Sequence, residues 1–310
     1  MVNFFKGILS VFKVLTITLG SIFVILFVVA ICAAIGLLSG GRGSDLDVIK
    51  SDRMVAVISV ADEIGRNVKA EDFQRQLNTQ LKDKNIKGIV VRVDSPGGSV
   101  GESEEIYLSI KNVRKREGSK PIVCSLGNLA ASGALYIASA CDKVVTLKGT
   151  LTGSIGVIMA SPNFSNIMQK YDVEMNVIKS GQFKDAGSPF RTMTEEDRSV
   201  LTKLVDQAFN QFVSAISESR NIPREDVLKI ADGRIILGEE AVTLGLADSI
   251  GNVNAAGQVV LDMLKLDGEP DLVYQRRNRF AAFFENFAES KVGFWLWGKQ
   301  PGVELKYLMY

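Results

Sequence analysis

The stretch KGIVVRVDSPGG, residues 87–98, decides the fold of this chain. Its first half is a run of apolar, mostly β-branched residues, which is typical of a strand buried in a sheet. Its second half, from Asp94 to Gly98, ends in the turn-forming sequence Pro-Gly-Gly. The stretch therefore predicts a buried strand with a glycine turn at its carboxyl end.

Strand and helix patterns alternate around this stretch. Strands are predicted at residues 54–60, 87–93, 121–126 and 143–147. Helices are predicted at residues 71–82, at the segment containing Ile106, Ile110 and Val113, and at residues 132–140. Strands that alternate with helices of this length need crossover connections, so we expect an α/β fold with a largely parallel sheet.

A long amphipathic helix is predicted to begin near Thr194, whose side chain can cap it while Asp197 lies three residues further on. One face of this helix is apolar: Leu201, Leu204, Val205, Ala208, Phe212 and Ile216. We expect this stripe to face the core, the alternative being a groove for a partner. Shorter helices are predicted near residues 224–230, 239–244 and 255–264.

The composition excludes several classes of protein. The chain has 310 residues and a net charge of +1, so no basic field favours nucleic acid. It has no histidine, which excludes a Ser-His-Asp triad, a Cys-His pair and any zinc site that uses histidine within this chain. No metal and no cofactor are expected. The hydrophobic content of 46% is ample for a sizeable core.

The three cysteines do not form a disulfide framework. Cys32 lies in an apolar amino-terminal segment. Cys124 and Cys141 could pair, but we interpret them as two small buried residues, because cysteine behaves as a minor hydrophobe in protein cores.

The amino-terminal segment predicts a membrane anchor. Residues 14–41 contain no charged side chain, and a spanning helix needs about 20 apolar residues. The apolar run is longer than that of a cleavable signal peptide, although cleavage near residues 30–34 is the alternative. Lys6 and Lys13 precede the span, so positive-inside reasoning keeps residues 1–13 in the cytoplasm.

The composition of the sequence after residue 41 divides it into three further segments. Residues 42–53 are predicted to form a flexible stem, because glycine and serine are frequent at its start. A folded domain is predicted at residues 54–268. Residues 269–310 form a basic and aromatic carboxy-terminal segment, which suits either a membrane interface or packing against a neighbouring subunit.

Small residues around Ser132 are the first candidate for chemistry. They follow a predicted strand and precede a predicted helix, where free N–H groups and the helix dipole stabilise negative charge. The backbone N–H groups of Gly98 and Gly133 could together form an oxyanion hole. The alternatives are an ordinary helix cap at Ser132 and an ordinary turn at Gly98.

A serine hydroxyl needs a base to remove its proton, and without histidine the candidates are lysine, aspartate and glutamate. A lysine can serve only when it is neutral. Because its ordinary pKa is near 10.4, burial must lower that pKa by about 3, which corresponds to about 4 kcal/mol. Spacing alone does not select one of the lysines.

Five blocks of the sequence resemble the signal peptide peptidase A (protease IV) family of bacterial membrane peptidases in its short single-domain form. They lie in order along the chain, at residues 94–98, 130–133, 150–157, 179–185 and 231–234. With the anchor, they cover roughly residues 10 to 265. Many relatives read Ser-Gly-Gly-Tyr where this chain has Ser132-Gly133-Ala134-Leu135-Tyr136, which leaves the Gly133 N–H intact.

The resemblance implies roles for particular residues. Ser132 is the nucleophile, and Lys184 rather than Lys179 is the general base, because the family's lysine follows the Lys-Ser-Gly sequence. Ser154 is implied to hold the lysine amine. The alternatives are an ordinary surface lysine at position 184 and a plain turn residue at position 154.

The resemblance also implies a fold and a function. The fold is that of the caseinolytic protease and crotonase superfamily, built from repeated ββα units, and relatives assemble into homo-oligomers whose serine and lysine can come from adjacent subunits. The function is a serine endopeptidase, bound to the bacterial inner membrane with its catalytic domain outside the cytoplasm, that degrades cleaved signal peptides and other hydrophobic peptides. A catalytically silent membrane scaffold and a crotonase-like acyl-CoA enzyme are the alternatives.

Overall fold

The structure, a computed structural model, describes residues 18–27, 29, 51–274 and 306–308. The chain divides into two compact units, Met1–Lys50 and Ser51–Tyr310, which we describe separately.

In the first unit, residues 18–27 are helical and their large apolar side chains are exposed. The rings of Phe23 and Phe27 stack along one side of this helix, with centroids 6.4 Å apart. Within the described ranges, no helix is both long and apolar enough to cross a membrane. Most of the span predicted at residues 14–41 lies outside the described residues.

The second unit is built on a sheet whose central strands are parallel. Its core runs from β1 (Met54–Ala61) through β2 (Gly88–Ser95) and β4 (Ile122–Ala131) to β6 (Leu151–Gly153). The central strands β2 and β4 are buried on both faces of the sheet over most of their length, which explains their nearly continuous apolar sequences. The predicted α/β class and parallel arrangement are confirmed.

Shorter strands complete the sheet. At one end, β7 (Ile235–Leu237) pairs with β6 in the antiparallel direction, and at the other β9 (Asp271–Tyr274) pairs in parallel with β1. The strands β5 (Lys143–Thr146) and β8 (Ser249–Ile250) extend from β4 as a parallel branch. The mixed sheet is consistent with the caseinolytic protease fold expected from the sequence.

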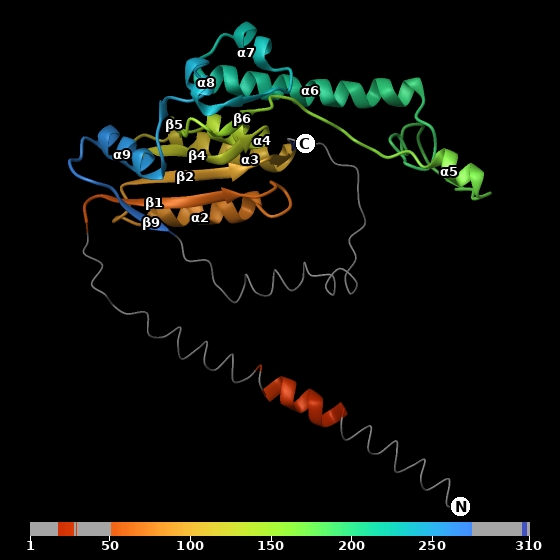
Figure 1. The fold of residues 1–310 in the computed structure, drawn as a ribbon, viewed down its shortest axis with the longest axis horizontal. Helices are drawn as coiled ribbons and strands as arrows, with labels where there is room; N and C mark the ends of the chain where they lie inside the picture. Colours follow the sequence, from red (N-terminus) through yellow and green to blue (C-terminus); the bar gives the residue numbers. More distant parts are fainter. Residues whose placement is uncertain (1–17, 28, 30–50, 275–305, 309–310) are drawn as a thin grey trace, which may run out of the picture. The chain divides into compact units, whose positions relative to one another are not determined.

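Helices cover the two faces of the sheet (Figure 1). The larger core lies on the face covered by α2 (Ala70–Lys82), α3 (Val100–Arg114) and α4 (Gly133–Ser139). On the other face, α9 (Val253–Leu264) buries Val260 and Leu261 against valines of four strands. This two-sided cover leaves the ends of the strands as the place for a site.

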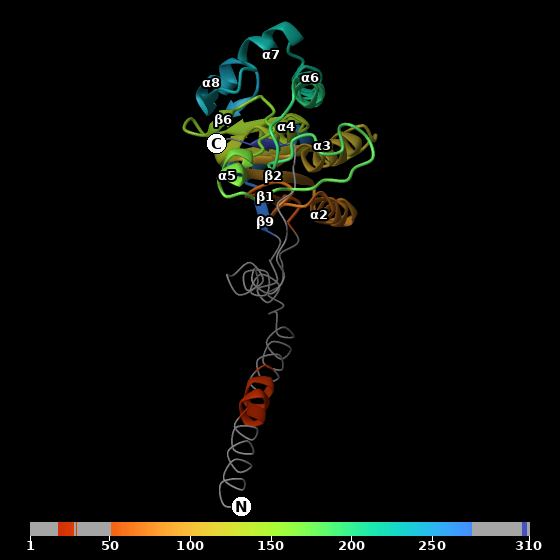
Figure 2. The ribbon, with the colours of Figure 1, turned by 90° about the vertical axis from the view of Figure 1, so that its right-hand side faces the viewer.

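The long helix α6 (Glu195–Arg220) begins as predicted, because Thr194 and Asp197 form a full capping box. It continues into α7 (Arg224–Ile230) and α8 (Gly238–Thr243), which lie above β6 in Figure 2, where α6 is seen along its axis.

Only the carboxy-terminal half of the α6 stripe faces the core. Phe212 and Ile216 are fully buried, whereas Leu204 is 41% exposed and Leu201 and Val205 are partly exposed. The prediction that the whole stripe packs in the core is therefore wrong for its first half. The physical reason is length, because α6 has 26 residues and extends beyond the sheet that it covers (Figure 1).

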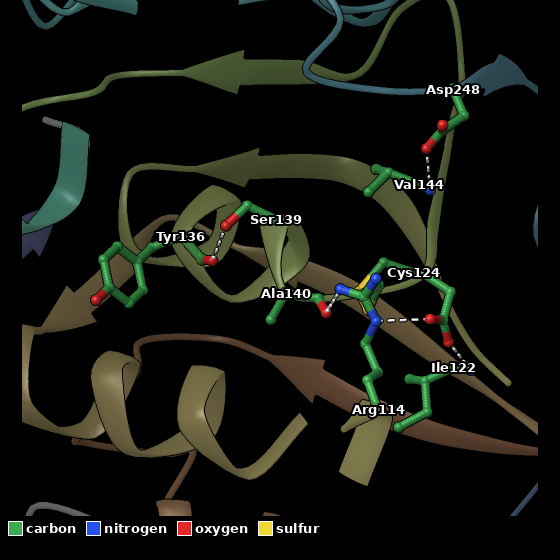
Figure 3. Close-up of a disulfide and its surroundings, with 10 residues drawn as sticks. Arg114, Ile122, Cys124, Tyr136, Ser139, Ala140, Val144 and Asp248 are labelled. Atoms are coloured by element: carbon green, nitrogen blue, oxygen red, sulfur yellow. Dashed lines mark hydrogen bonds and ion pairs between the residues drawn. A yellow bond between two sulfur atoms is a disulfide. The ribbon is translucent and has the colours of Figure 1, made fainter. Parts of the chain in front are cut away.

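The interpretation of Cys124 and Cys141 as unpaired residues is also wrong. Both are buried, as expected, but they form a disulfide (Figure 3). Cys124 lies near the start of β4 and Cys141 follows α4, and the packing of this helix on the sheet brings their Cα atoms to 5.7 Å. The bond closes the segment that contains Ser132, and a loop of this length is stabilised by about 3 kcal/mol in the chain-entropy account.

Candidate active site

Ser132 lies on the sharp turn between β4 and α4. Its φ of +55° and ψ of −120° are unusual for a residue with a side chain, and such strain costs about 1–3 kcal/mol. Its side chain is fully buried, and its Oγ has no hydrogen-bond partner among the described residues. A buried hydroxyl that forms no hydrogen bond is costly, so its presence on a strained turn indicates a functional role.

Asp94 supports this turn from the neighbouring strand. Its carboxylate accepts hydrogen bonds from the backbone N–H groups of Asn128, at 3.3 Å, and Leu129, at 3.0 Å. A Cβ at Gly127 would lie 2.5 Å from the Asp94 carboxylate, so only glycine allows this approach. The sequence drew attention to Asp94 only as part of a turn, and its supporting role was missed because the partner segment is distant in sequence.

The glycine turn at residues 97–98 is itself a short strand, β3 (Gly97–Ser99). The Ile64 N–H donates to the Gly97 carbonyl at 2.8 Å, and the Ser99 N–H donates to the Ile64 carbonyl at 2.9 Å. A Cβ at Gly98 would lie 1.9 Å from the Ile64 oxygen. Gly98 therefore leaves just enough room for this neighbouring backbone.

The structure brings four of the predicted site residues together. Gly133 begins α4 directly after Ser132, and α4 contacts β3, which contains Gly98. Ser154 directly follows β6, the strand that pairs with the end of β4. The Ser132 N–H donates to the carbonyl of Gly153, the last residue of β6, at 2.9 Å. Ser154 is buried, and its N–H donates to the Arg234 carbonyl at 2.7 Å.

Lys184 is not placed with them. It is exposed, and its amine forms no hydrogen bond with Ser154 or any other described residue. It belongs to residues 155–194, which leave the sheet after β6, reach α5 (Ser165–Lys170) and join the outer end of α6; α6 itself then leads back to the sheet (Figure 1). Large apolar side chains are exposed on this arm: Ile158, Phe164, Ile167, Tyr171, Val173, Met175, Val177, Ile178, Phe183 and Phe190.

The loop that carries Lys184 is held by an ion-pair cluster centred on Arg191. The Arg191 guanidinium donates to both carboxylate oxygens of Asp185, at 2.8 and 2.9 Å, and also to Asp197 at the start of α6. Lys179 also pairs with Asp185. Because Asp185 directly follows Lys184, this cluster fixes the backbone next to the lysine.

The same cluster shifts the acidity of its carboxyls. Hydrogen bonds from Arg191, then from Lys179, hold the pKa of Asp185 well below its usual range. Hydrogen bonds from Arg191, then from the Thr194 backbone, lower the pKa of Asp197 to about 2. Sequence reasoning missed Arg191, since a single arginine after a turn has no distinctive pattern.

Replacement of Arg191 with alanine is expected to lower the free energy of unfolding at pH 7. Both carboxyls have a depressed pKa in the folded state, so their contribution is complete above the unfolded value of about 3.9 and is lost as the pH falls towards 2. Denaturant titrations of the variant and the wild type should therefore differ most at pH 7, and the difference should become smaller at pH 2.5.

Arg198→Ala is the matched control, because its ion pair with Glu195 is exposed and measures 4.0 Å. It should behave as the wild type at both pH values. An equal loss for Arg191→Ala at pH 7 and pH 2.5 would contradict the role of the cluster.

The mixed α/β sheet that carries this strained, buried serine at its strand ends is consistent with a fold of the caseinolytic protease class. Family comparison agrees with this class, since the Clp protease model matches residues 46–177. The model of peptidase family S49 matches residues 114–267. The chain belongs to peptidase family S49.

Individual relatives point the same way. A Synechocystis protein named as a protease is 40% identical over 193 residues, covering 62% of this chain and 68% of the relative. A Methanocaldococcus jannaschii protein, also named as a protease, is 33% identical over 267 residues, covering 81% and 84% of the two chains. An Enterococcus faecium protein named signal peptide peptidase SppA is 35% identical over 227 residues, covering 73% and 64%.

The resemblance to the signal peptide peptidase A (protease IV) family is thereby confirmed. The Protease 4 of Haemophilus influenzae is a much longer relative, of which this chain covers 33% at 30% identity. Membership of a peptidase family favours a protease over the acyl-CoA enzyme that shares the general fold.

Proposed function

We propose that this chain is a serine endopeptidase that degrades cleaved signal peptides and other hydrophobic peptides derived from membranes. The observation that carries the proposal is the buried Ser132 hydroxyl, which has no hydrogen-bond partner in the part of the chain that the structure describes and lies on a strained turn at the start of α4. The name of the Enterococcus faecium relative supports the substrate class.

The proposed reaction follows the chemistry of an activated serine. Lys184, as the neutral amine, takes the Ser132 proton while Oγ bonds to the substrate carbonyl carbon. The N–H groups of Gly98 and Gly133 hold the resulting oxyanion. When the C–N bond breaks, the proton passes to the leaving amine, and water then hydrolyses the acyl-enzyme.

The dyad is proposed to form between two copies of the chain. The exposure of Lys184 on an arm that leaves the sheet supports this arrangement, as do the many exposed apolar side chains of that arm. The exposed half of the α6 stripe adds further apolar surface. Apolar surface of this extent marks an interaction site, and covering it would favour the neutral form of the lysine. Ser154 would then hold the amine.

The proposed location is the bacterial inner membrane, with a single amino-terminal anchor and the peptidase domain outside the cytoplasm. The uncharged sequence of residues 14–41 supports the anchor. Lys6 and Lys13 precede it with no acidic residue among them, whereas Arg42 after it is soon followed by acidic residues, and this asymmetry supports the orientation. The aromatic residues near the carboxy-terminal end are proposed as additional contacts with lipid or with a neighbouring subunit.

A fluorophosphonate probe tests the nucleophile. The detergent-solubilised protein is expected to be labelled, because an activated serine attacks the phosphorus atom as it would a carbonyl. Labelling should disappear in Ser132→Ala and fall by at least about 100-fold in rate in Lys184→Ala, which loses the general base. Lys179→Ala is the control for the second lysine of the loop and should retain labelling, although its contact with Asp185 is lost. Persistent labelling of Ser132→Ala would rule out the assignment.

A further inference from the structure

The turn at residues 231–234 is a motif of the sequence that the proposed reaction does not use. It reads Ala-Asp-Gly-Arg, follows α7 and leads directly into β7, the strand that pairs with β6. Ala231 is buried, whereas the side chains of Asp232 and Arg234 are exposed. The turn is therefore anchored in the core by its first residue and lies at the surface beside the end of β6.

An ion pair closes this turn. The Arg234 Nε donates to both carboxylate oxygens of Asp232, at 2.8 and 2.9 Å, and the Arg234 backbone N–H donates to the same carboxylate at 3.1 Å. Gly233, between the two residues, has a φ of +85°, which glycine adopts without strain. Hydrogen bonds from the Arg234 side chain, then from its backbone, lower the pKa of Asp232 to about 2, so the pair stays charged at neutral pH.

The backbone carbonyl of Arg234 contacts the end of β6. It accepts a hydrogen bond from the Ser154 N–H at 2.7 Å. A Cβ at Gly153 would lie 2.8 Å from the same oxygen, so a side chain there would push the carbonyl away. The turn also approaches Gly156, where a Cβ would lie 3.6 Å from the Gly233 Cα. The turn therefore packs against the backbone on both sides of Ser154.

The peptide group between Gly153 and Ser154 is bonded at both of its ends. Its carbonyl accepts the Ser132 N–H at 2.9 Å, and its N–H donates to the Arg234 carbonyl. With the first bond alone this peptide group could pivot about its oxygen, whereas the second bond fixes its orientation. Ser154 depends on that orientation, because its φ of +49° is unusual for a residue with a side chain and persists only when the surroundings hold it.

We propose that Arg234, closed onto Asp232, is a positioning residue that fixes the direction of the Ser154 hydroxyl. This inference rests on the proposed function, in which Ser154 holds the amine of Lys184. Arg234 acts through its backbone carbonyl, and its side chain keeps that carbonyl in place by binding Asp232. Loss of the guanidinium frees the turn, lets the peptide group pivot and turns the hydroxyl away from the amine. Reacting groups tolerate displacements of only about 1 Å.

A double-mutant cycle tests this inference on the full-length, detergent-solubilised protein with the fluorophosphonate probe. Arg234→Ala and Ser154→Ala are each expected to lower the second-order rate constant of labelling by about 10- to 100-fold. The double variant should be no slower than Ser154→Ala, because Arg234 has no effect once the hydroxyl that it positions is gone. A merely structural role would lower the rate by the same factor in both backgrounds.

Two further variants serve as controls. Lys229→Ala removes an ion pair with Asp226 that is similarly exposed, measures 2.7 Å and lies in α7 just before the turn. This variant should be labelled at the wild-type rate. Asp232→Asn keeps an oxygen for the Arg234 N–H but loses the charge. It should show the same coupling to Ser154→Ala as Arg234→Ala does, and it replaces Arg234→Ala in the cycle if that variant fails to fold.

The outcomes separate this inference from the proposed function. Equal losses from Arg234→Ala in the presence and absence of the Ser154 hydroxyl would overturn the inference. Labelling of Arg234→Ala or of Ser154→Ala at the wild-type rate would also overturn it. A wild-type protein that is not labelled at all would contradict the proposed function, and this inference with it, so the two failures are distinguishable.

Discussion

A mixture of two inactive variants, Ser132→Ala and Lys184→Ala, is expected to regain peptidase activity after co-assembly. Each variant alone should lose at least about 10⁴-fold in kcat/KM, because nucleophile and base act as one unit. If each site takes its serine from one copy and its lysine from the next, random assembly restores about a quarter of the sites. The measurement is the rate of cleavage of an apolar fluorogenic peptide after joint refolding or subunit exchange.

Activity is expected to return in the mixture because Ser132 and Lys184 of one chain are not placed together. Ser132 is buried at the strand ends, whereas Lys184 is exposed on the arm between β6 and α6. The control is a mixture of Ser132→Ala with the double variant Ser132→Ala/Lys184→Ala, which supplies no serine and should remain inactive. A mixture of the single variants that also remains inactive, although co-assembly is demonstrated, would contradict a dyad shared between copies.

Gly98→Ala is expected to remove most of the activity and part of the stability. Its Cβ would lie 1.9 Å from the Ile64 carbonyl oxygen, and backbone atoms can yield only by moving β3. That movement displaces the proposed oxyanion donor, and loss of one such donor costs about 10²–10³ in kcat. Overpacking adds about 1–3 kcal/mol of destabilisation. Steady-state kinetics should show the loss mainly in kcat, and thermal melts should show a lower Tm.

Gly101→Ala is the matched control for this substitution. Gly101 lies three residues further on, in α3, and a Cβ there meets no atom within 4 Å. This variant should keep the activity and gain slightly in stability, because alanine favours a helix more than glycine does. A Gly98→Ala protein with wild-type kcat would show that the β3 edge does not hold the oxyanion.

Much of the fold was accessible from local sequence because its signals are local. The valine-rich run before Asp94 is a strand in the structure because its residues are buried on both faces. Thr194 and Asp197 form the predicted capping box, since all of its partners lie within one helical turn. The turn at Ser132 was also accessible, because small residues between a strand and a helix indicate it in any context.

The candidate site was accessible only in part. The resemblance implied Ser132 and Ser154, and the local turns indicated Gly98 and Gly133. The parallel sheet brings these four residues together at its strand ends. The role of Lys184 remains a prediction, because in one chain its side chain is exposed. Whether a lysine is neutral depends on how deeply its amine is buried, and the spacing of residues along the sequence does not reveal that burial.

The sequence by itself determined the strand and helix pattern, the glycine turn beside Ser132, the exclusion of histidine chemistry and the resemblance to a peptidase family. Only the tertiary structure decided the disulfide between Cys124 and Cys141, the Arg191 cluster, the exposed half of α6 and the pairing of residues 306–308 with β3. The physical reason is the separation along the sequence of the residues that interact. Propensity, capping and turn chemistry act within a few residues, whereas these contacts depend on how distant segments pack, and packing routinely overrides local preference.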